Sequence, residues 1–337
     1  MITAENISLK PFTTFAVDAK ARFFIELFSQ EEIISFLGVS RSEHRPLLIL
    51  GGGSNILFTK DFPGTVLKIA VRGIDILSED NDHVYIRASA GENWDNFTRY
   101  TVEKGWGGLE NLSLIPGNVG TSPVQNIGAY GTELKDVLHS VEAIDIETAR
   151  KRSFSAEECG LKYRDSIFKK DLKGRFIIVS CTYRLSKEPM VNLSYKALRV
   201  ELETMTVRNP SIQDVRNAVI GIRRRKLPDP AMIGNAGSFF KNPSVSAEDL
   251  EKLKGKYPGI AFYQQADGYK VPAAWLIEQC GWKGKRFGDA GVHVNHPLVL
   301  VNYGSASGEE IMALANMIRD SVFERFGIFL EEEVNIF

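Results

Sequence analysis

One serine in the second half of the chain stands where its hydroxyl could be presented to a bound molecule. Ser238 lies in the stretch GNAGSFFKNP, residues 234–243, with two glycines before it and two phenylalanines after it. A loop serine has no need of two aromatic neighbours, and a core strand has no need of two glycines. A turn in which the hydroxyl bonds its own backbone is the structural alternative. The combination favours a presented hydroxyl.

Two glycine-rich loops in the first half could hold an anionic cofactor. Gly51-Gly52-Gly53-Ser54-Asn55 follows the apolar run LLIL at 47–50, and IPGNVGTSPVQNIGAYG spans 115–131. Small residues allow consecutive backbone N–H groups to approach an anion. The second loop adds polar side chains between its glycines. Each loop alone is typical of a structural turn, whereas the two together favour a cofactor with a diphosphate.

The sequence gives little support for a dinucleotide fingerprint, a P-loop, a metal site or a disulfide framework. Ile56 stands where a dinucleotide fingerprint needs its third glycine, and no P-loop motif occurs. His293 and His296 form an H-x-x-H pattern, but on an expected strand two residues three apart point to opposite faces. We therefore expect no metal site there. Three scattered cysteines indicate neither a disulfide framework nor a zinc ribbon.

Composition is that of an ordinary globular protein. The 337 residues are 44% hydrophobic and 25% charged, with a net charge of −1, which gives no broad attraction to nucleic acid or an anionic membrane. No apolar run approaches the roughly 20 residues of a membrane-spanning helix, and the N-terminal residues lack the pattern of a signal peptide. We expect a cytoplasmic protein with no nucleic-acid, membrane or metal partner.

The elements that position these loops follow from periodicity and capping signals. Helices are expected from Ser29, over 92–104, from Ser211 to before Pro228, and from Ser307 to Gly327. Strands are expected at the following ranges: 47–50, 66–69, 84–88, 137–146, 175–185 and 328–337. The mixture predicts an α+β protein, with a domain boundary near 205–213.

Several long motifs resemble those of the UDP-N-acetylenolpyruvoylglucosamine reductases, also called UDP-N-acetylmuramate dehydrogenases, of peptidoglycan precursor synthesis. They are LGGGSNILF, IPGNVGTSPVQNIGAYG, CGLKYRDSIFK, KLPDP, GNAGSFFKNP, QADG and LEEEV, in that order. The likeness spans nearly the whole chain. It is closest to the type I branch, whose tyrosine-bearing loop corresponds to LSYKAL with Tyr195.

The resemblance implies a fold and a cofactor. Two FAD-binding subdomains of the vanillyl-alcohol-oxidase (PCMH) type are expected at 1–70 and 71–210, and a substrate-binding domain at 211–327, with 328–337 possibly returning to the first. FAD is expected to bind without a covalent bond, and NADPH to be the hydride donor. The partners implied are the two small molecules, NADPH and the UDP-sugar. FAD contacts are implied for Gly51, Gly52, Gly53, Ser54, Asn55, Gly117, Gly120, Thr121, Ser122, Gln125, Asn126 and Gly131.

The resemblance also implies catalytic and substrate-binding residues. Ser238 matches the proton donor, Arg164 the arginine that binds the substrate carboxylate, and Glu333 the catalytic glutamate. Strand alternation alone cannot choose among the three glutamates at 331–333, and Arg164 could instead pair with Asp165 at the surface. Substrate contacts are implied for Tyr195, Lys226, Asn242, Tyr263, Lys283 and His296. His296 departs from the family, which often has glutamine there.

Two alternatives differ from this interpretation in kind. A flavin oxidase of the same fold with covalently attached FAD needs a histidine or cysteine placed to take the flavin, and neither glycine loop contains one. A non-catalytic UDP-sugar-binding protein would have no use for a proton donor. The joint presence of Ser238, Arg164 and Glu333 argues against the second.

Overall fold

The computed structural model describes residues 1–39, 44–265 and 268–337, in two compact units. Unit 1 contains residues 1–7, 21–52 and 63–225, and unit 2 contains residues 8–20, 53–62 and 226–337. Two residues of the QADG motif, 266 and 267, lie outside the described residues. The expected three-way division at 70 and 210 stays a prediction.

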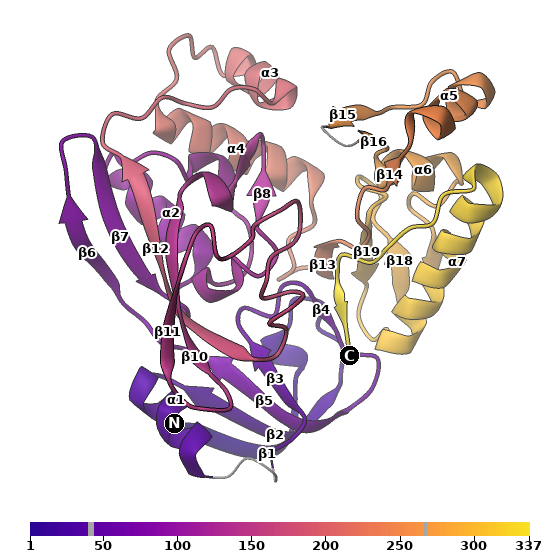
Figure 1. The fold of residues 1–337 in the computed structure, drawn as a ribbon. Coiled ribbons are helices and arrows are strands. Elements are labelled where there is room, and N and C mark those ends of the chain that lie inside the picture. The colour runs from indigo at the N-terminus through magenta and orange to yellow at the C-terminus, as the bar shows by residue number, and fades with distance from the viewer. Residues whose placement is uncertain (40–43, 266–267) are drawn as a thin grey trace. The chain divides into compact units, whose positions relative to one another are not determined.

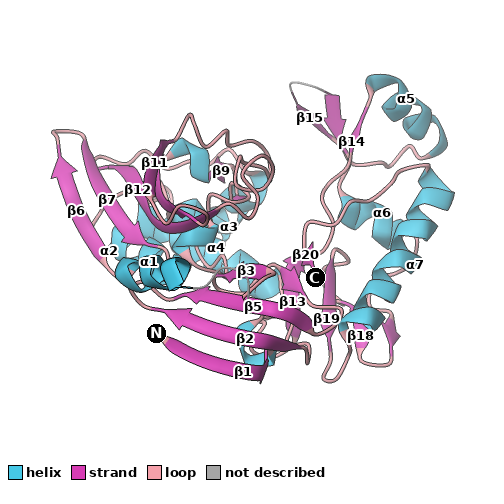
Figure 2. Ribbon diagram, turned by 60° about the horizontal axis from the view of Figure 1, so that its bottom comes forward, coloured by secondary structure: helices cyan, strands magenta, loops and turns pink. Residues whose placement is uncertain are grey.

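A four-stranded sheet and one helix form the first layer of unit 1. The strands are β1 (Ile2–Ser8), β2 (Lys20–Leu27), β5 (Phe62–Ile69) and β3 (Leu47–Leu50), in that spatial order (Figure 2). Helix α1 (Gln30–Val39) buries Ile33, Phe36 and Leu37 in a cluster that also contains Leu27 and Leu67. Its first turn is capped by Ser29, whose Oγ accepts the Glu32 N–H at 3.2 Å.

A second, five-stranded antiparallel sheet carries the rest of unit 1 (Figure 1). Its order is β11 (Lys151–Ser155), β10 (Leu138–Asp145), β12 (Phe176–Ser186), β7 (His83–Ser89) and β6 (Ile74–Glu79). Helix α2 (Trp94–Glu103) packs the rings of Trp94 and Phe97 on Tyr183 of β12. The remaining elements are β8 (Gly128–Ala129), β9 (Thr132–Glu133), α3 (Lys196–Thr204) and α4 (Ile212–Lys226).

The described residues of unit 2 form three small sheets and three α-helices. One sheet has the order β13 (Gly234–Ser238), β19 (Val299–Asn302), β18 (Ala290–Val292) and β17 (Arg286–Phe287). The second has the order β14 (Ser244–Val245), β16 (Gly268–Lys270) and β15 (Tyr263–Gln265). In the third, β4 (Ile56–Leu57) pairs in parallel with β20 (Asn335–Ile336), as Figure 1 shows. The helices are α5 (Ala247–Lys256), α6 (Ala273–Gln279) and α7 (Gly308–Phe326).

Helix α7 begins and ends where the sequence predicts. Ser307 and Glu310 form a capping box, and Gly327 terminates the helix in a left-handed conformation with φ 68°. Its buried face, which includes Ile311 and Ile318, joins the core of unit 2. The predicted helices and most of the predicted strands are confirmed, as is the α+β class.

The C-terminal segment differs from the predicted continuous strand over 328–337. Only Asn335–Ile336 forms a regular strand, and Glu332 makes an isolated bridge with Phe240. The segment pairs with two different partners in succession, which prevents one long ladder. The predicted alternation survives nonetheless, because Leu330 and Val334 are buried while Glu331 is exposed.

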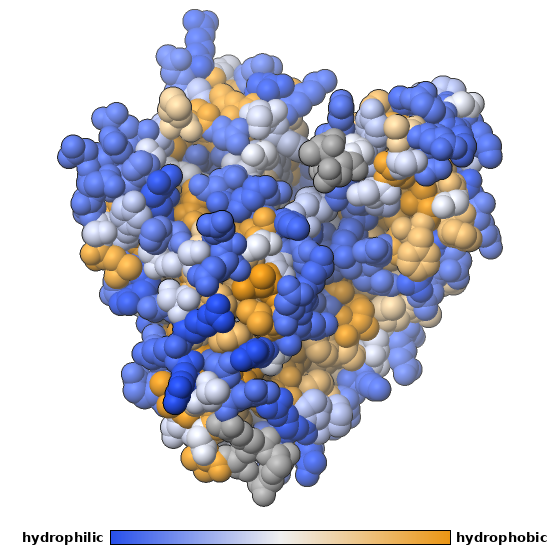
Figure 3. All heavy atoms as spheres, viewed as in Figure 1, coloured by the Kyte–Doolittle hydropathy of each residue, from blue (hydrophilic) through white to orange (hydrophobic). Residues whose placement is uncertain are grey.

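Most side chains on the face shown in Figure 3 are hydrophilic, with apolar residues scattered among them. Among the described residues, no helix is long and apolar enough to cross a membrane.

Candidate active site

The two glycine-rich loops predicted to hold a cofactor are in contact in unit 1. A Cβ atom on Gly52 would lie 2.6 Å from the Cα of Gly117 and 2.7 Å from Oδ1 of Asn118. A Cβ on Gly51 would lie 2.5 Å from Cγ2 of Thr121. No real side chain tolerates such distances, so glycine is required for the two backbones to approach. The residues from 53 onward in the first loop group with unit 2.

Two predicted FAD contacts in the second loop turn their side chains into the protein. The Ser122 hydroxyl donates to the Val119 carbonyl at 2.7 Å and lies 3.2 Å from the Tyr183 hydroxyl. The Asn126 amide donates to Glu133 and to the Lys162 carbonyl at 3.1 and 3.0 Å. Both side chains are buried, so they hold the loop in shape. Their direct contact with a cofactor stays a prediction.

The start of the second loop is clamped by charged groups. Leu114 has a φ of 58°, a left-handed conformation that is unfavourable for a branched side chain. Its N–H donates to Asp95 Oδ1 at 2.6 Å, and its carbonyl accepts Nε of Arg223 at 3.2 Å. Arg216 in turn donates to both oxygens of Asp95, at 2.8 and 3.1 Å. These charge-assisted bonds fix the residue that leads into Ile115 and the loop.

Asp95 is ionised in this arrangement. Burial opposes its ionisation, but the hydrogen bonds from Arg216 and from the Leu114 N–H prevail and lower the pKa of Asp95. Sequence reasoning missed Asp95, because an acidic residue in the first turn of a helix is ordinary.

Arg164 does not form the surface pair that the sequence left open. Asp165 pairs instead with Lys170. The Arg164 guanidinium donates to the Gly128 carbonyl at 3.2 Å, which brings it beside the second glycine loop. Its φ of 54° is left-handed, a strained state that surrounding contacts must maintain. The predicted carboxylate-binding residue is therefore half-buried and held in place.

A second arginine accompanies it. Arg223, half-buried on α4, interacts electrostatically with Arg164 and hydrogen-bonds Tyr130. Burial lowers the pKa of Arg223. Tyr130 also packs edge-on against Tyr195, with ring centroids 5.3 Å apart. Sequence reasoning treated the arginines at 223–225 as helix-end cations, and only the fold separates Arg223 from its two exposed neighbours.

In unit 2, Ser238 ends β13 on a rigid frame. Gly237 has a φ of 72°, and its N–H donates to Oδ1 of Asn235 at 3.0 Å. The two phenylalanines after the serine are fully buried in the core of unit 2, with ring centroids 5.1 Å apart. Phe239 and Phe240 therefore anchor the backbone that carries Ser238, which stays half-buried.

Glu333 lies beside this serine-bearing segment. Its N–H donates to the Phe239 carbonyl at 2.8 Å, and the Lys241 N–H donates to the Glu331 carbonyl at 2.9 Å. The C-terminal segment thus runs antiparallel to residues 239–241. The Glu333 carbonyl also accepts Nδ2 of Asn55, at 3.1 Å, from the first glycine loop. Unit 2 brings together Asn55, Glu333 and the residue that follows Ser238.

The two neighbouring glutamates have ion-pair partners. Glu331 pairs with Lys241 at 2.9 Å, and Glu332 pairs with Arg319 at 2.6 Å. The assignment of the catalytic role to Glu333 stays a prediction.

The predicted substrate residues of unit 2 lie on several elements. Lys226 ends α4, Asn242 accepts the Ala273 N–H at 2.9 Å, and Lys283 pairs with Glu278 at 2.8 Å. Tyr263 begins β15 and is largely exposed. The structure thus bonds the side-chain oxygen of Asn242 to the start of α6.

The prediction that the H-x-x-H pattern lies on a strand is wrong. His293 and His296 lie between β18 and β19, not on a strand. His293 N–H donates to the Val299 carbonyl at 2.9 Å, and Val299 N–H donates to the His296 carbonyl at 3.0 Å. This tight connection places the two imidazoles near enough to interact electrostatically.

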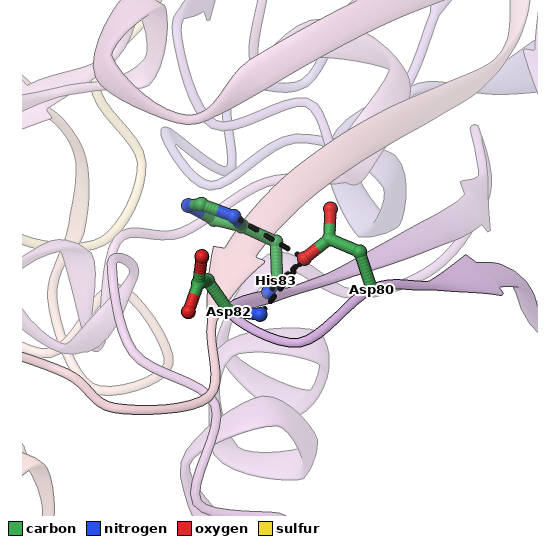
Figure 4. Close-up of side chains that lie close together, drawn as sticks. All are labelled: Asp80, Asp82 and His83. Carbon is green, nitrogen blue, oxygen red and sulfur yellow. Dashed lines mark hydrogen bonds and ion pairs between the residues drawn. The ribbon is translucent and has the colours of Figure 1, made fainter.

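A cluster of potential metal ligands in the described residues lies elsewhere, in the turn between β6 and β7 (Figure 4). Asp80 Oδ1 accepts the N–H groups of Asp82 and His83 at 2.9 and 2.7 Å, and lies 3.6 Å from the His83 ring. The bond from the His83 N–H lowers the pKa of Asp80 most, and the bond from the Asp82 N–H lowers it further. The cluster is explained by its role in closing the turn.

Comparison with known proteins agrees with this arrangement. The family described as "FAD binding domain" matches residues 21–150, and the family described as "UDP-N-acetylenolpyruvoylglucosamine reductase, C-terminal domain" matches residues 229–337. Curated relatives called UDP-N-acetylenolpyruvoylglucosamine reductase include one from Flavobacterium johnsoniae, 50% identical over 98% of both chains. One from Pseudomonas putida is 48% identical over 99% of this chain and 98% of its own.

A solved structure is similar in fold. The crystal structure of UDP-N-acetylenolpyruvylglucosamine reductase from Thermus caldophilus covers 100% of both chains with a TM-score of 0.70 at 24% identity. The fold and the paired glycine loops define an FAD-dependent oxidoreductase. Within that class, the chain belongs to the UDP-N-acetylenolpyruvoylglucosamine reductase family.

The close approach of the two loops can be tested at Gly52. In Gly52→Ala, the added methyl group must push the Gly117 backbone away, and overpacking of this kind costs about 1–3 kcal/mol. If the loops hold FAD together, this cost weakens FAD binding about five- to hundredfold. The dissociation constant of FAD, measured by flavin fluorescence, checks this. Gly38→Ala is the control, because a Cβ there meets nothing within 4 Å. Equal affinity in both variants would contradict the prediction.

The Leu114 clamp can be tested at Asp95. Asp95→Asn leaves the buried Arg216 without a counter-charge, and we expect a loss of about 2–3 kcal/mol in the free energy of unfolding at pH 7, between the values for exposed and buried pairs. Because the folded pKa of Asp95 is lowered, its contribution is present above the unfolded pKa of about 4 and is lost as pH falls through the folded value. The deficit should therefore shrink in acid. Urea unfolding at several pH values measures it.

The matched control for this clamp is Asp75→Asn. Asp75 pairs with Arg87 at 3.0 Å on an exposed strand, so its removal should cost less than about 1 kcal/mol. A deficit for Asp95→Asn that is no larger than this, or that persists unchanged in acid, would show that the clamp contributes little.

Proposed function

We propose that the chain reduces the enolpyruvyl ether of UDP-N-acetyl-3-O-(1-carboxyvinyl)-glucosamine to UDP-N-acetylmuramate, with NADPH as the source of hydride. The observation that carries the proposal is the backbone bond from Glu333 to Phe239, which sets the predicted glutamate beside the predicted serine donor in a chain of this family. We place the reaction in the cytoplasm, in peptidoglycan precursor synthesis, with small molecules as its only partners.

The residues around the glycine loops fit a flavin diphosphate. Gly52 meets the backbone of Gly117, and Gly51 meets the side chain of Thr121, so closely that neither glycine leaves room for a Cβ atom. Backbone N–H groups of such small residues suit an anion. The glycine loops would hold FAD, which would supply the hydride chemistry between NADPH and the substrate. Of the residues predicted to contact FAD, Ser122 and Asn126 support the loop through hydrogen bonds of their buried side chains.

Addition of hydride to an enolpyruvyl ether drives negative charge onto the neighbouring carbon and its carboxylate. Arg164 is suited to stabilise this charge, because a planar guanidinium can hold a carboxylate by two bonds. Its strained backbone and its bond to Gly128 keep it oriented before substrate arrives. A preorganised donor of this type contributes about 3–4 kcal/mol to a barrier. Arg223 stands close enough to add positive charge.

Ser238 completes the reaction by giving its hydroxyl proton to the carbon that bears the carboxylate. A serine hydroxyl is a very weak acid, yet an enolate-like carbanion is basic enough to take its proton. Phe239 and Phe240 fix the serine through the core, and Glu333, whose N–H bonds the Phe239 carbonyl, is proposed to stabilise the aci-carboxylate as an acid. Tyr195, Lys226, Asn242, Tyr263, Lys283 and His296 are proposed to bind the nucleotide sugar.

The visible spectrum tests the proposal directly. Purified protein should be yellow, anaerobic NADPH should bleach it, and the enolpyruvyl substrate should restore the colour. A protein that stays colourless under every reconstitution with FAD would overturn the proposal. A protein that bleaches but does not recover with the substrate would be a flavin reductase of another specificity.

Removal of the Ser238 hydroxyl separates the two halves of the cycle. In Ser238→Ala, NADPH should bleach the flavin at the normal rate, while reoxidation by substrate should slow about 10²–10⁴-fold, the usual contribution of a placed proton donor. Anaerobic stopped-flow absorbance measures both rates. The exposed Ser305 provides the control, since Ser305→Ala should change neither. Normal reoxidation in Ser238→Ala would remove Ser238 from the donor role.

A further inference from the structure

Both peptide groups of Glu333 are fixed by hydrogen bonds to different parts of unit 2. Its N–H donates to the Phe239 carbonyl at 2.8 Å, and its carbonyl accepts Nδ2 of Asn55 at 3.1 Å. Phe239 follows Ser238 directly, whereas Asn55 ends the first glycine loop. Because peptide groups are planar, two held peptides fix the direction in which the Glu333 side chain leaves the backbone.

Asn335 completes this connection. Its N–H and its side-chain Nδ2 both donate to the Asn55 carbonyl, at 3.1 and 2.9 Å. Together with the bond from Asn55 to Glu333, these bonds join residue 55 to residues 333–335, and we call the group the asparagine clip. Asn55 directly precedes β4 and Asn335 begins β20, so the clip lies at the end of this parallel pair.

The side-chain bond of Asn55 is separable from the pairing of the strands. Backbone bonds continue the β4–β20 pair, such as the bond from the Phe337 N–H to the Leu57 carbonyl at 2.9 Å. The Asn55 amide extends this line of bonds beyond the pair, to the Glu333 carbonyl. Alanine at position 55 therefore keeps the backbone bonds of the two strands and removes the bond to Glu333.

Apolar packing holds the segment that follows Glu333. Val334 is buried in the core of unit 2. The Phe337 ring packs against Phe58 and Phe62, with ring centroids 6.0 and 6.3 Å apart. These contacts keep β20 in place without the Asn55 amide, so the loss of that amide should loosen Glu333 and leave β20 paired.

We infer that Asn55 and Asn335 are positioning residues for Glu333, and that the asparagine clip holds the proposed catalytic glutamate at a fixed place relative to Ser238. The inference rests on the proposed function, which supplies the role of Glu333. It gives the Asn55 side chain a task other than the predicted contact with FAD, and it brings Asn335 into the site.

The position of Glu333 matters for one half of the catalytic cycle. Negative charge develops on the substrate carboxylate when the enolpyruvyl group is reduced, and a group that is already in place stabilises that charge best. A displacement of about 1 Å can slow such a step about 10²-fold. The step with NADPH develops no such charge. Loss of the clip should therefore slow the reaction with the enolpyruvyl substrate and leave the reaction with NADPH unchanged.

Anaerobic stopped-flow absorbance of the FAD-loaded enzyme measures the two half-reactions separately. In Asn55→Ala we expect reoxidation by the enolpyruvyl substrate to slow about 10- to 100-fold, while reduction by NADPH keeps its rate. In Asn335→Ala the backbone N–H still bonds the Asn55 carbonyl, so we expect a smaller slowing, about two- to tenfold. Asn217→Ala is the control, because Asn217 is exposed on α4 and both rates should stay native.

A double-mutant cycle with Glu333→Ala shows whether the clip acts through this glutamate. Glu333→Ala keeps the backbone bonds and leaves no carboxyl group to position, so the addition of Asn55→Ala should cause no further slowing. A merely structural role of Asn55 would slow the native enzyme and Glu333→Ala by the same factor. That result, or normal reoxidation in Asn55→Ala, would overturn the inference.

The dissociation constant of FAD shows whether Asn55→Ala still binds the cofactor. If it does not, the same cycle is run with Asn335→Ala, because Asn335 is not among the predicted FAD contacts. Normal reoxidation in that variant, or equal slowing with and without the Glu333 carboxyl group, overturns the inference. Normal reoxidation in Glu333→Ala overturns it together with the proposed role of the glutamate. A native enzyme whose flavin spectrum responds to neither NADPH nor the enolpyruvyl substrate would instead overturn the proposed function.

Discussion

The rest of unit 1 depends on the close contact between the backbones of Gly52 and Gly117, which leaves no room for a methyl group between them. Gly52 and Gly117 are far apart in sequence, and their contact requires that both loops hold a fixed backbone conformation. The second loop buries Val119 and Ile127 in the core of unit 1, and polar bonds fix the backbone between these anchors. Among these bonds is that of Ser122 with Tyr183, and the charged clamp at Leu114 fixes the start of the loop.

In unit 2, buried aromatic side chains fix the backbone that carries the predicted catalytic residues. Phe239 and Phe240 are fully buried, and the main chain of Phe239 bonds Glu333 of the C-terminal segment through its carbonyl and Leu298, just before β19, through its N–H. A polar residue next to such an anchor gains a fixed position without being buried itself. The same segment that positions Ser238 therefore also positions Glu333, and the core of the unit determines the spacing of both.

The sequence predicted the parts of the fold that depend on local signals. The capping box at Ser307 and the glycine at 327 delimit α7, because both act within one helical turn. The prediction of one continuous strand over 328–337 was wrong, although the predicted alternation of buried and exposed side chains was correct. The segment changes its pairing partner midway, and a short stretch of sequence does not indicate which distant strand it will pair with. The same limit explains the site: motifs indicated Ser238 and Arg164, whereas Asp95 and Arg223 act through contacts that no neighbouring residue indicates.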